Sequence, residues 1–312
     1  MTGDDSPSSD REDDYGTLYV VGIGPGLPEH ATRRAQEVIR NADCVIVADL
    51  YRRFLCEGGI LPPAALEDDS IADGDGTTFD EEVVVRESGH EQTLVRSSMG
   101  RQRELAELSV RRVRDGEDVV HVSGGDPNVY GKADLLFSAA QQAGAEDLPI
   151  EVVPGVTAAT GAAAALGAPL SNDFCTVSLS ERWRPWDEIG RKLRAAAESG
   201  FVIVLYNPRG NHRRALATIR EERAGDVPVA VVTDVGRKEA GRVGERRRIA
   251  TLEELLDNED DGNDGNEDEA SDDGIDAMAT TLVVGNAGTE IREFGGRRCM
   301  FTPRGDREIT DF

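Results

Sequence analysis

The stretch LYVVGIGPG, from Leu18 to Gly26, decides the fold class of this chain. Its apolar beginning predicts a buried strand, and its Gly-Pro-Gly end predicts a tight turn. Two later stretches repeat the pattern. The apolar run Val119–Val122 leads into Gly124–Pro127 (GGDP), and Ile150–Val153 leads into Pro154–Thr157 (PGVT). Three buried strands that each end in a glycine turn indicate a sheet with ligand-binding loops along one edge.

Helical spacing separates these strands. Apolar residues recur three or four positions apart in 32–41, 101–115 and 133–143, and Cys44–Ala48 predicts one more buried strand. Strands that alternate with helices predict a parallel α/β sheet in the first half of the chain. We expect Gly58–Ser98 to be irregular.

The second half of the chain alternates less regularly. Helical spacing fits only Trp186–Glu198 and His212–Glu222. We therefore expect a second α/β domain with a mixed sheet and fewer helices, beginning near Pro154-Gly155. The strand candidates of this domain are Phe174–Leu179, Phe201–Tyr206, Val229–Thr233, Thr281–Val284 and Arg298–Phe301.

The net charge of −25 is concentrated in three acidic segments. Residues 1–14, 67–82 and 257–276 hold 25 of the 60 acidic residues and one of the 35 basic residues, which leaves the rest nearly neutral. Runs of one charge are usually solvated and disordered. The predicted organisation is an acidic disordered tail over 1–15, a first domain over 16–154 with an acidic insertion at 67–92, and a second domain over 155–312 with an acidic disordered insertion at 257–276.

The composition predicts a cytoplasmic protein from a high-salt cell. Only three of the 35 basic residues are lysines, and acid-rich, lysine-poor chains are typical of halophilic proteins. The acidic envelope argues against a nucleic-acid substrate, because phosphates would be repelled. The polar N-terminus does not resemble a signal peptide, and no apolar run is long enough to span a membrane. The four cysteines form no CxxC pair and no zinc-ligand spacing with histidine, so we expect reduced thiols and no metal site.

The first glycine turn by itself is compatible with a nucleotide site. A dinucleotide fold requires GxGxxG at the opening of a helix, with an acid about twenty residues later. This chain instead has GxGPG followed by Leu27-Pro28, and the nearest later acid at a strand end is Asp49. A nucleotide-dependent oxidoreductase and a ligand-binding module without catalysis therefore stay open as alternatives.

The three glycine turns together carry a more specific signal. GIGPG at 22–26, GGDPNVYG at 124–131 and VVPGVTA at 152–158, in this order and spacing, resemble the class III S-adenosylmethionine methyltransferases, the tetrapyrrole methylase superfamily. Further segments resemble one branch, the precorrin-3B C(17)-methyltransferases and cobalt-factor III methyltransferases. These segments are SSMG (97–100), APLSNDF (168–174), VSLS (177–180), PW (185–186), VLYNPR (204–209), TTLVVGN (280–286) and TPRG (302–305). Asn128 departs from the branch, where a small residue is usual.

The resemblance implies two α/β domains with the active site in the cleft between them, and S-adenosylmethionine as co-substrate. It also implies a homodimer that methylates carbon 17 of precorrin-3B or cobalt-factor III, coupled to ring contraction. A salt-rich archaeal origin favours the cobalt-bearing substrate. By motif position, the residues implied to bind the cofactor are Pro25, Gly124, Gly125, Asp126, Val129, Thr157, Ala158, Asn207 and Thr280.

Methyl transfer from a sulfonium makes few demands on side chains. The protein mainly aligns the carbon nucleophile, the methyl group and sulfur, so neither a catalytic triad nor a metal is expected. Asp49 and Tyr51 are candidates for orienting the macrocycle or relaying a proton. Asp49 is alternatively a solvated carboxylate at a strand end, and Asp126 a turn residue that accepts from its own amides. We expect His121, in an apolar strand, to be a core residue.

Other members of the superfamily remain as alternatives, namely another precorrin methyltransferase, diphthine synthase or a ribosomal RNA methyltransferase. The acidic surface speaks against RNA, and the LYNPR and TPRG segments favour the C(17) branch.

The charge distribution predicts that the melting temperature rises with salt. The acidic segments repel one another, and the screening length falls from about 10 Å at about 0.1 M salt to about 3 Å at about 1 M. Salts with excluded anions also strengthen apolar burial. Thermal unfolding between about 0.1 M and about 2 M salt should therefore show a rising Tm, with a weaker dependence in a variant that lacks all three segments. Equal salt slopes for the two chains would contradict this localisation of the repulsion.

Overall fold

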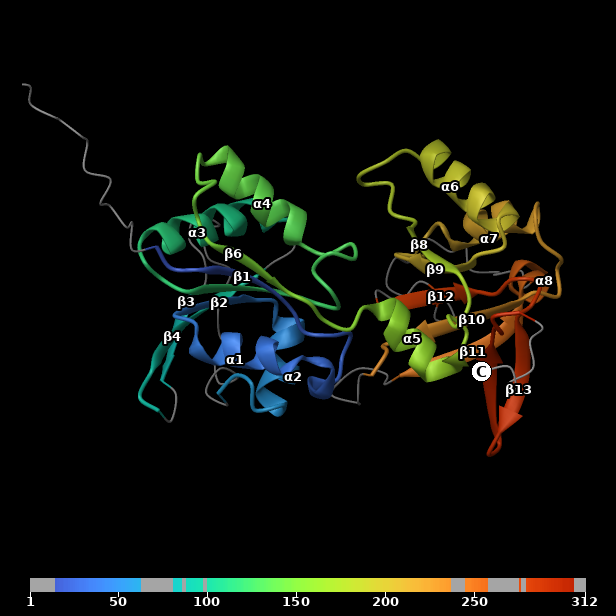
Figure 1. Ribbon diagram of the computed structural model, residues 1–312, viewed down its shortest axis with the longest axis horizontal. Helices are drawn as coiled ribbons and strands as arrows, with labels where there is room; N and C mark the ends of the chain where they lie inside the picture. Colours follow the sequence, from blue (N-terminus) through green and yellow to red (C-terminus); the bar gives the residue numbers. More distant parts are fainter. Residues whose placement is uncertain are drawn as a thin grey trace, which may run out of the picture. The chain divides into compact units, whose positions relative to one another are not determined.

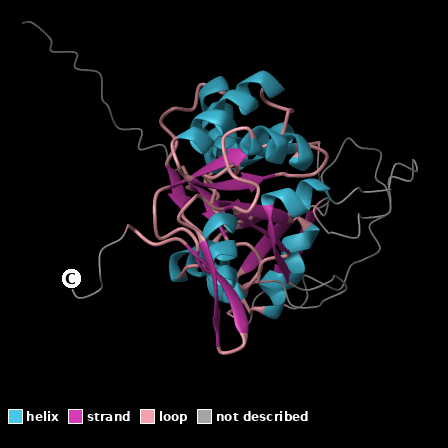
Figure 2. Ribbon diagram, turned by 90° about the vertical axis from the view of Figure 1, so that its right-hand side faces the viewer, coloured by secondary structure: helices cyan, strands magenta, loops and turns pink. Residues whose placement is uncertain are grey.

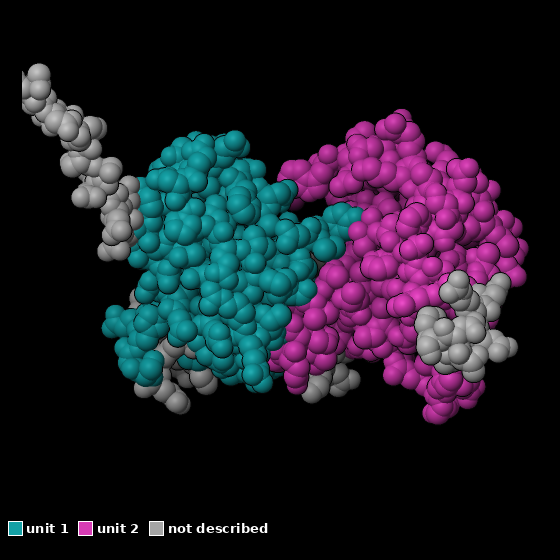
Figure 3. Space-filling view, viewed as in Figure 1, with its two compact units in different colours: residues 1–22, 31–155 teal, residues 23–30, 156–312 magenta. Residues whose placement is uncertain are grey.

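The computed structural model describes residues 15–62, 81–85, 88–97, 100–236, 245–257, 275 and 279–305. The chain divides into two compact α/β units (Figure 3), Met1–Gly22 with Ala31–Gly155 and Ile23–His30 with Val156–Phe312. The predicted class, α/β with a parallel first sheet and a mixed second sheet, is confirmed.

The first unit is built on a six-stranded sheet in the order β3-β4-β2-β5-β1-β6 (Figure 1). Five strands run parallel, and β3 pairs antiparallel with β4 at the edge. α3 and α4 cover one face of the sheet, and α1 and α2 lie on the other. The strands are β1 (Leu18–Gly22), β2 (Cys44–Val47), β3 (Glu81–Val85), β4 (Glu91–Arg96), β5 (Val119–Ser123) and β6 (Ile150–Val153); the helices are α1 (Arg33–Asn41), α2 (Asp49–Glu57), α3 (Gln102–Arg114) and α4 (Ala133–Gln142).

The expectation that Gly58–Ser98 is irregular was wrong for two strands. β4 extends the parallel sheet beside β2, and β3 follows at the edge, so 81–85 and 91–92 of the predicted acidic insertion belong to the sheet. β4 was not predicted from the sequence because the polar residue Gln92 interrupts its apolar pattern. The Gln92 amide is buried and donates to the carbonyls of Ile39 and Ala42 at 2.9 and 2.7 Å, which satisfies it inside the core.

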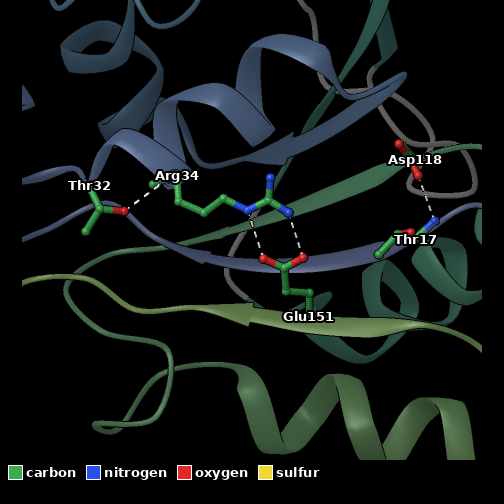
Figure 4. A network of polar contacts seen from close by, with 6 residues as sticks. Thr17, Thr32, Arg34, Asp118 and Glu151 are labelled. Atoms are coloured by element: carbon green, nitrogen blue, oxygen red, sulfur yellow. Dashed lines mark hydrogen bonds and ion pairs between the residues drawn. The ribbon is translucent and has the colours of Figure 1, made fainter.

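Polar contacts tie elements of the first unit together (Figure 4). Arg34 of α1 donates through Nε and Nη2 to the two carboxylate oxygens of Glu151 in β6, at 3.0 and 2.7 Å. This hydrogen-bonded pair holds the pKa of Glu151 below its usual range. The backbone N–H of Thr17 donates to Asp118 Oδ1 at 2.8 Å, and Thr32 caps α1 by accepting from the N–H of Ala35.

The second unit contains a five-stranded mixed sheet in the order β11-β10-β12-β9-β8 and a three-stranded sheet in the order β13-β14-β7. Only β8 and β9 pair in parallel within the larger sheet. The hairpin of β13 and β14 projects from the unit (Figure 2). The strands are β7 (Gly167–Ala168), β8 (Phe174–Ser178), β9 (Val202–Tyr206), β10 (Pro228–Thr233), β11 (Arg246–Thr251), β12 (Thr280–Val284), β13 (Glu290–Phe294) and β14 (Arg297–Phe301).

The second unit holds more helices than expected. Two were predicted, but the described residues form four: α5 (Ala158–Leu166), α6 (Trp186–Glu198), α7 (His212–Arg220) and α8 (Leu252–Asp257). α5 has no polar face to reveal it, because it is an alanine-rich segment buried against the larger sheet. Two residues of the predicted insertion 257–276 belong to the folded unit. Asp257 is the last residue of α8, and Ile275 is buried in the core around α6, α7 and α8. The remaining residues of the insertion lie outside the described ranges.

The loop Ile23–His30, which includes a single 3₁₀ turn, η1 (Pro28–His30), groups with the second unit rather than with the predicted first domain. A Cβ added to Gly161 of α5 would lie 3.0 Å from the ring of Pro25, and one on Gly236 would lie 2.9 Å from Leu27. These close approaches explain why the loop packs with later parts of the chain. No described helix is long and apolar enough to cross a membrane.

Candidate functional site

The carboxyl ends of β5, β1 and β6 are neighbours in the first sheet, so the glycine turns that follow these strands begin side by side. A Cβ on Gly155 would lie 2.3 Å from the carbonyl oxygen of Gly125, and a Cβ on Gly22 would lie 2.8 Å from that same oxygen. Only glycine permits such close approach of three backbones. The sequence signal of repeated glycine turns therefore has a direct structural cause.

The carboxylate of Asp126 joins two of these turns. Its Oδ1 accepts from the N–H of Asn128 at 2.8 Å, and its Oδ2 accepts from the N–H of Gly155 at 3.1 Å. Asp126 thus accepts from its own turn, as the alternative interpretation held, and also from the turn after β6. Its predicted contact with the cofactor remains a prediction.

The remaining predicted residues of this turn are held by backbone geometry. Gly125 has a φ of +69°, which favours glycine, and Tyr130 has a φ of +54°, which is uncommon for a residue with a side chain. The N–H of Val129 donates to the carbonyl of Asp126 at 3.2 Å. Strained backbone of this kind gathers at ligand-binding turns.

Asp49 and Tyr51 lie in the first turn of α2, a helix that the sequence analysis did not predict. Asp49 is thus the first residue of a helix, and Arg96 at the end of β4 donates from Nε to its Oδ2 at 2.6 Å. Asp49 is not a free carboxylate at a strand end. Tyr51 reaches the glycine turn, where a Cβ on Gly124 would lie 2.0 Å from its hydroxyl oxygen. The structure thus brings Tyr51 and Gly124 together and leaves the side chain of Asp49 half-exposed in an ion pair.

In the second unit, Tyr206 connects the predicted site residues. Its hydroxyl lies 2.5 Å from Oγ1 of Thr157, the N-cap of α5, and accepts from the N–H of Ala159 at 2.8 Å. Ala158, the predicted residue between them, is the first residue of the helix. Sequence reasoning missed Tyr206, although it stands next to Asn207 in the LYNPR segment.

Asn207 and Thr280 lie at the same end of the second sheet. Asn207 follows β9 with a φ of +52°, and its Nδ2 donates to Ser178 Oγ at 3.0 Å. The neighbouring strand β12 begins at Thr280, and its second residue, Thr281, pairs with Tyr206 at the end of β9. Thr280 therefore lies at the same end of the sheet as Asn207. The hydroxyls of Thr280 and Thr233 are 3.0 Å apart and buried. Pro25 packs at Gly161 of α5, in the same unit.

Lys132 is a second residue that the sequence analysis did not assign. It follows the GGDPNVYG turn, and burial lowers its pKa from 10.5 to about 8. The buried imidazole of His121 lies in β5, as expected for a core residue, with Nδ1 3.4 Å from Ser109 Oγ. Burial, followed by the charge of Lys132, holds the pKa of His121 well below its usual range. Among the described residues, no group of histidine, cysteine and acidic side chains has the arrangement of a metal site.

The fold places glycine turns at the carboxyl ends of parallel strands, which is the edge where α/β sheets generally bind ligands. Residues 17–256 match the family of tetrapyrrole (corrin/porphyrin) methylases. The chain belongs to this tetrapyrrole methylase family.

Curated relatives show which branch of the family this chain resembles. A precorrin-3B C(17)-methyltransferase of Sinorhizobium sp is 34% identical, over 93% of this chain and 96% of the relative. A cobalt-factor III methyltransferase of Priestia megaterium is 30% identical over 93% of this chain, which spans only 45% of that longer protein. Among solved structures, the methyltransferase CobJ superposes with a TM-score of 0.67 at 26% identity, covering 92% of this chain and 100% of CobJ.

The contact between Tyr51 and Gly124 gives a prediction for a double-mutant cycle. Gly124→Ala should lower the unfolding free energy by roughly 1–3 kcal/mol, because its Cβ would displace the Tyr51 hydroxyl. In a Tyr51→Ala background the same substitution should cost less, since the clash is gone. Urea unfolding of the four chains measures the coupling, and strictly additive losses would contradict the contact.

Proposed function

We propose that this protein transfers the methyl group of S-adenosylmethionine to carbon 17 of a tetrapyrrole intermediate of cobalamin biosynthesis, precorrin-3B or cobalt-factor III, with contraction of the ring. The supporting observation is the set of glycine turns joined by Asp126, in a chain that matches a precorrin-3B C(17)-methyltransferase along nearly its whole length. Family membership supports methyl transfer to a tetrapyrrole.

The site residues suit a reaction that needs alignment more than acid–base chemistry. When bound, S-adenosylmethionine supplies a methyl group that its positive sulfur has already activated. Gly125 gives this turn a left-handed φ of +69°, and the hydroxyl of Tyr51 fills the space where a Cβ on Gly124 would lie. In the second unit, Thr157, Ala158, Asn207 and Thr280 present polar and backbone groups at one end of the sheet. Preorganised turns of this kind hold reactants in line.

Asp49 and Tyr51 are our candidates for contact with the macrocycle. The pairing with Arg96 fixes the direction of the Asp49 carboxylate, which an orienting residue requires. Tyr51 carries a hydroxyl at the edge of the glycine turn, where it can donate to a ring substituent or relay a proton.

The dinucleotide alternative loses support from local structure. A dinucleotide turn opens directly into a helix, so that the helix N-terminus faces the phosphates. Here the GIGPG turn leads into the 3₁₀ turn η1, and α1 begins only at Arg33. The first helix is therefore displaced from the turn that would have to bind pyrophosphate.

We further propose that the enzyme works in a salt-rich cytoplasm as a homodimer. The lysine-poor, acid-rich composition supports the salt-rich cytoplasm. The homodimer is carried over from what the sequence motifs of the C(17) branch imply. A cobalt-bearing substrate fits the same origin.

Product analysis tests the proposed reaction. The protein should convert precorrin-3B or cobalt-factor III to a product that is one methyl group heavier, with stoichiometric S-adenosylhomocysteine. With a ¹³C-labelled methyl donor, NMR should locate the label on carbon 17. A label on another carbon would assign the chain to a different methylase of the family, and retention of a nicotinamide nucleotide without methyl transfer would contradict the proposal.

Substitution of Gly125 should separate cofactor binding from folding. Gly125→Val places a branched side chain at a φ of +69° in the turn, so calorimetry should show a sharp loss of S-adenosylhomocysteine affinity. Gly144→Val is the matched control, because Gly144 lies just past the end of α4 at a φ of +57°, with nothing within 4 Å of an added Cβ. Each variant should lose roughly 1–2 kcal/mol of stability from left-handed strain, but only the first should lose affinity. Unchanged affinity in folded Gly125→Val would contradict the assignment of the turn.

A further inference from the structure

Lys132 places an ammonium group at the carboxyl ends of two parallel strands. It is the N-cap residue of α4, directly after the GGDPNVYG turn. Its Nζ lies 3.4 Å from the carbonyl oxygen of Val122 in β5 and 3.5 Å from Oγ of Ser97, which follows β4. Both distances are at the long end for hydrogen bonds, so the three N–H donors are only weakly engaged.

The groups around this ammonium are neutral. In the part of the chain that the structure describes, no carboxylate lies within 4.0 Å of Nζ. Gln102 of α3 donates to the same Ser97 hydroxyl at 3.3 Å, and His121 of β5 is kept neutral by its burial. A half-buried cation without an anionic partner is energetically unfavourable, which is why its pKa falls to about 8.

An ordinary structural lysine behaves differently. Such a residue extends its ammonium into water or pairs it with a carboxylate. Lys192 shows the second arrangement, with Nζ 2.7 Å from Glu188 on the surface of α6. The third lysine, Lys238, lies outside the described residues. Packing alone therefore does not account for the position of Lys132.

Two backbone amides of the neighbouring glycine turns already have an anionic partner within the protein. Two of the amides that a carboxylate would use, those of Asn128 and Gly155, already donate to Asp126. The ammonium of Lys132 lies directly after this turn and has no carboxylate partner among the described residues.

We propose that Lys132 binds a carboxylate of a ligand at the carboxyl ends of β4 and β5. This inference rests on the proposed function, in which two sources of a carboxylate are present. One is the methionine part of the cofactor, and the other is the acetate and propionate side chains of the tetrapyrrole. Ser97 and Gln102 complete the subsite with a hydroxyl and an amide that can rearrange toward the bound anion.

The titration of Lys132 gives the subsite a distinct signature. A bound carboxylate favours the charged amine and raises its pKa above about 8, so binding at pH above 8 takes up a proton. Affinity should therefore fall as the pH rises through this range. The stability of the free protein depends on pH in the opposite direction. The unfolded chain, in which the lysine has a pKa of 10.5, binds the proton more tightly than the folded chain. The contribution of Lys132 to folding stability therefore rises as the pH rises from about 8 to 10.5.

Two substitutions test the subsite. Lys132→Met keeps the length of the side chain and removes its charge, whereas Lys192→Met removes a surface lysine as the matched control. Calorimetry compares S-adenosylhomocysteine with decarboxylated S-adenosylmethionine, and steady-state kinetics give the KM for the tetrapyrrole. Loss of a charged hydrogen bond corresponds to about 10-fold or more in affinity.

Each of these two measurements identifies one source of the carboxylate. If the cofactor supplies the carboxylate, Lys132→Met loses affinity for S-adenosylhomocysteine but not for the decarboxylated analogue, and proton uptake at pH about 8.5 disappears. If the tetrapyrrole supplies it, the KM rises about 10-fold at unchanged S-adenosylhomocysteine affinity. Lys192→Met should leave both values at wild type.

A readout on the wild-type protein covers the case in which Lys132→Met does not fold. The chain has only three lysines, so trace acetylation followed by mass spectrometry resolves each one. The ligand that occupies the subsite should protect Lys132 and raise its apparent pKa, with no effect at Lys192. Unprotected Lys132 together with unchanged affinity and KM would overturn the subsite while methyl transfer stands. A wild-type protein that neither binds S-adenosylhomocysteine nor transfers a methyl group would overturn the proposed function and the subsite with it.

Discussion

The carboxylate of Asp126 is the interaction on which the candidate site of the first unit depends. It joins the turn after β5 to the turn after β6 through the amides of Asn128 and Gly155. Hydrogen bonds from amides to a charged acceptor are stronger than those between neutral groups, so one side chain can hold two loops at a separation that no Cβ would tolerate.

Two cations that are removed from solvent, Arg223 and Lys132, associate with neutral oxygens. Arg223 is buried in the second unit and donates to the carbonyls of Gly285, Phe201 and Ala196, which joins the end of α6 to the end of β12. Lys132 likewise faces a carbonyl and a hydroxyl. The two cations differ in how well their N–H donors are supplied with hydrogen-bond acceptors. The planar guanidinium of Arg223 is well supplied with acceptors, whereas the two contacts of Lys132 are long for hydrogen bonds.

Surface ion pairs have a smaller part in the fold. Arg34–Glu151 and Lys192–Glu188 are well formed, but all four side chains are substantially exposed. Solvent screens such pairs, and each contributes little to stability. The apolar cores of the two units therefore carry the fold, while the charges determine how the protein responds to salt.

Residue order alone determined the alternating α/β class, the three glycine turns and the family, because these depend on local periodicity and on the unique conformational freedom of glycine. It did not reveal β4, whose buried Gln92 needs carbonyls from another segment, or α5, whose alanines have no polar face. The role of Tyr206 was also hidden, since its partners Thr157 and Ala159 lie nearly fifty residues earlier in the chain. Only the tertiary structure decided that Asp49 is paired and that Lys132 has no carboxylate among the described residues. The charge state and orientation of a polar side chain depend on neighbours that the fold brings together, and local sequence carries no record of them.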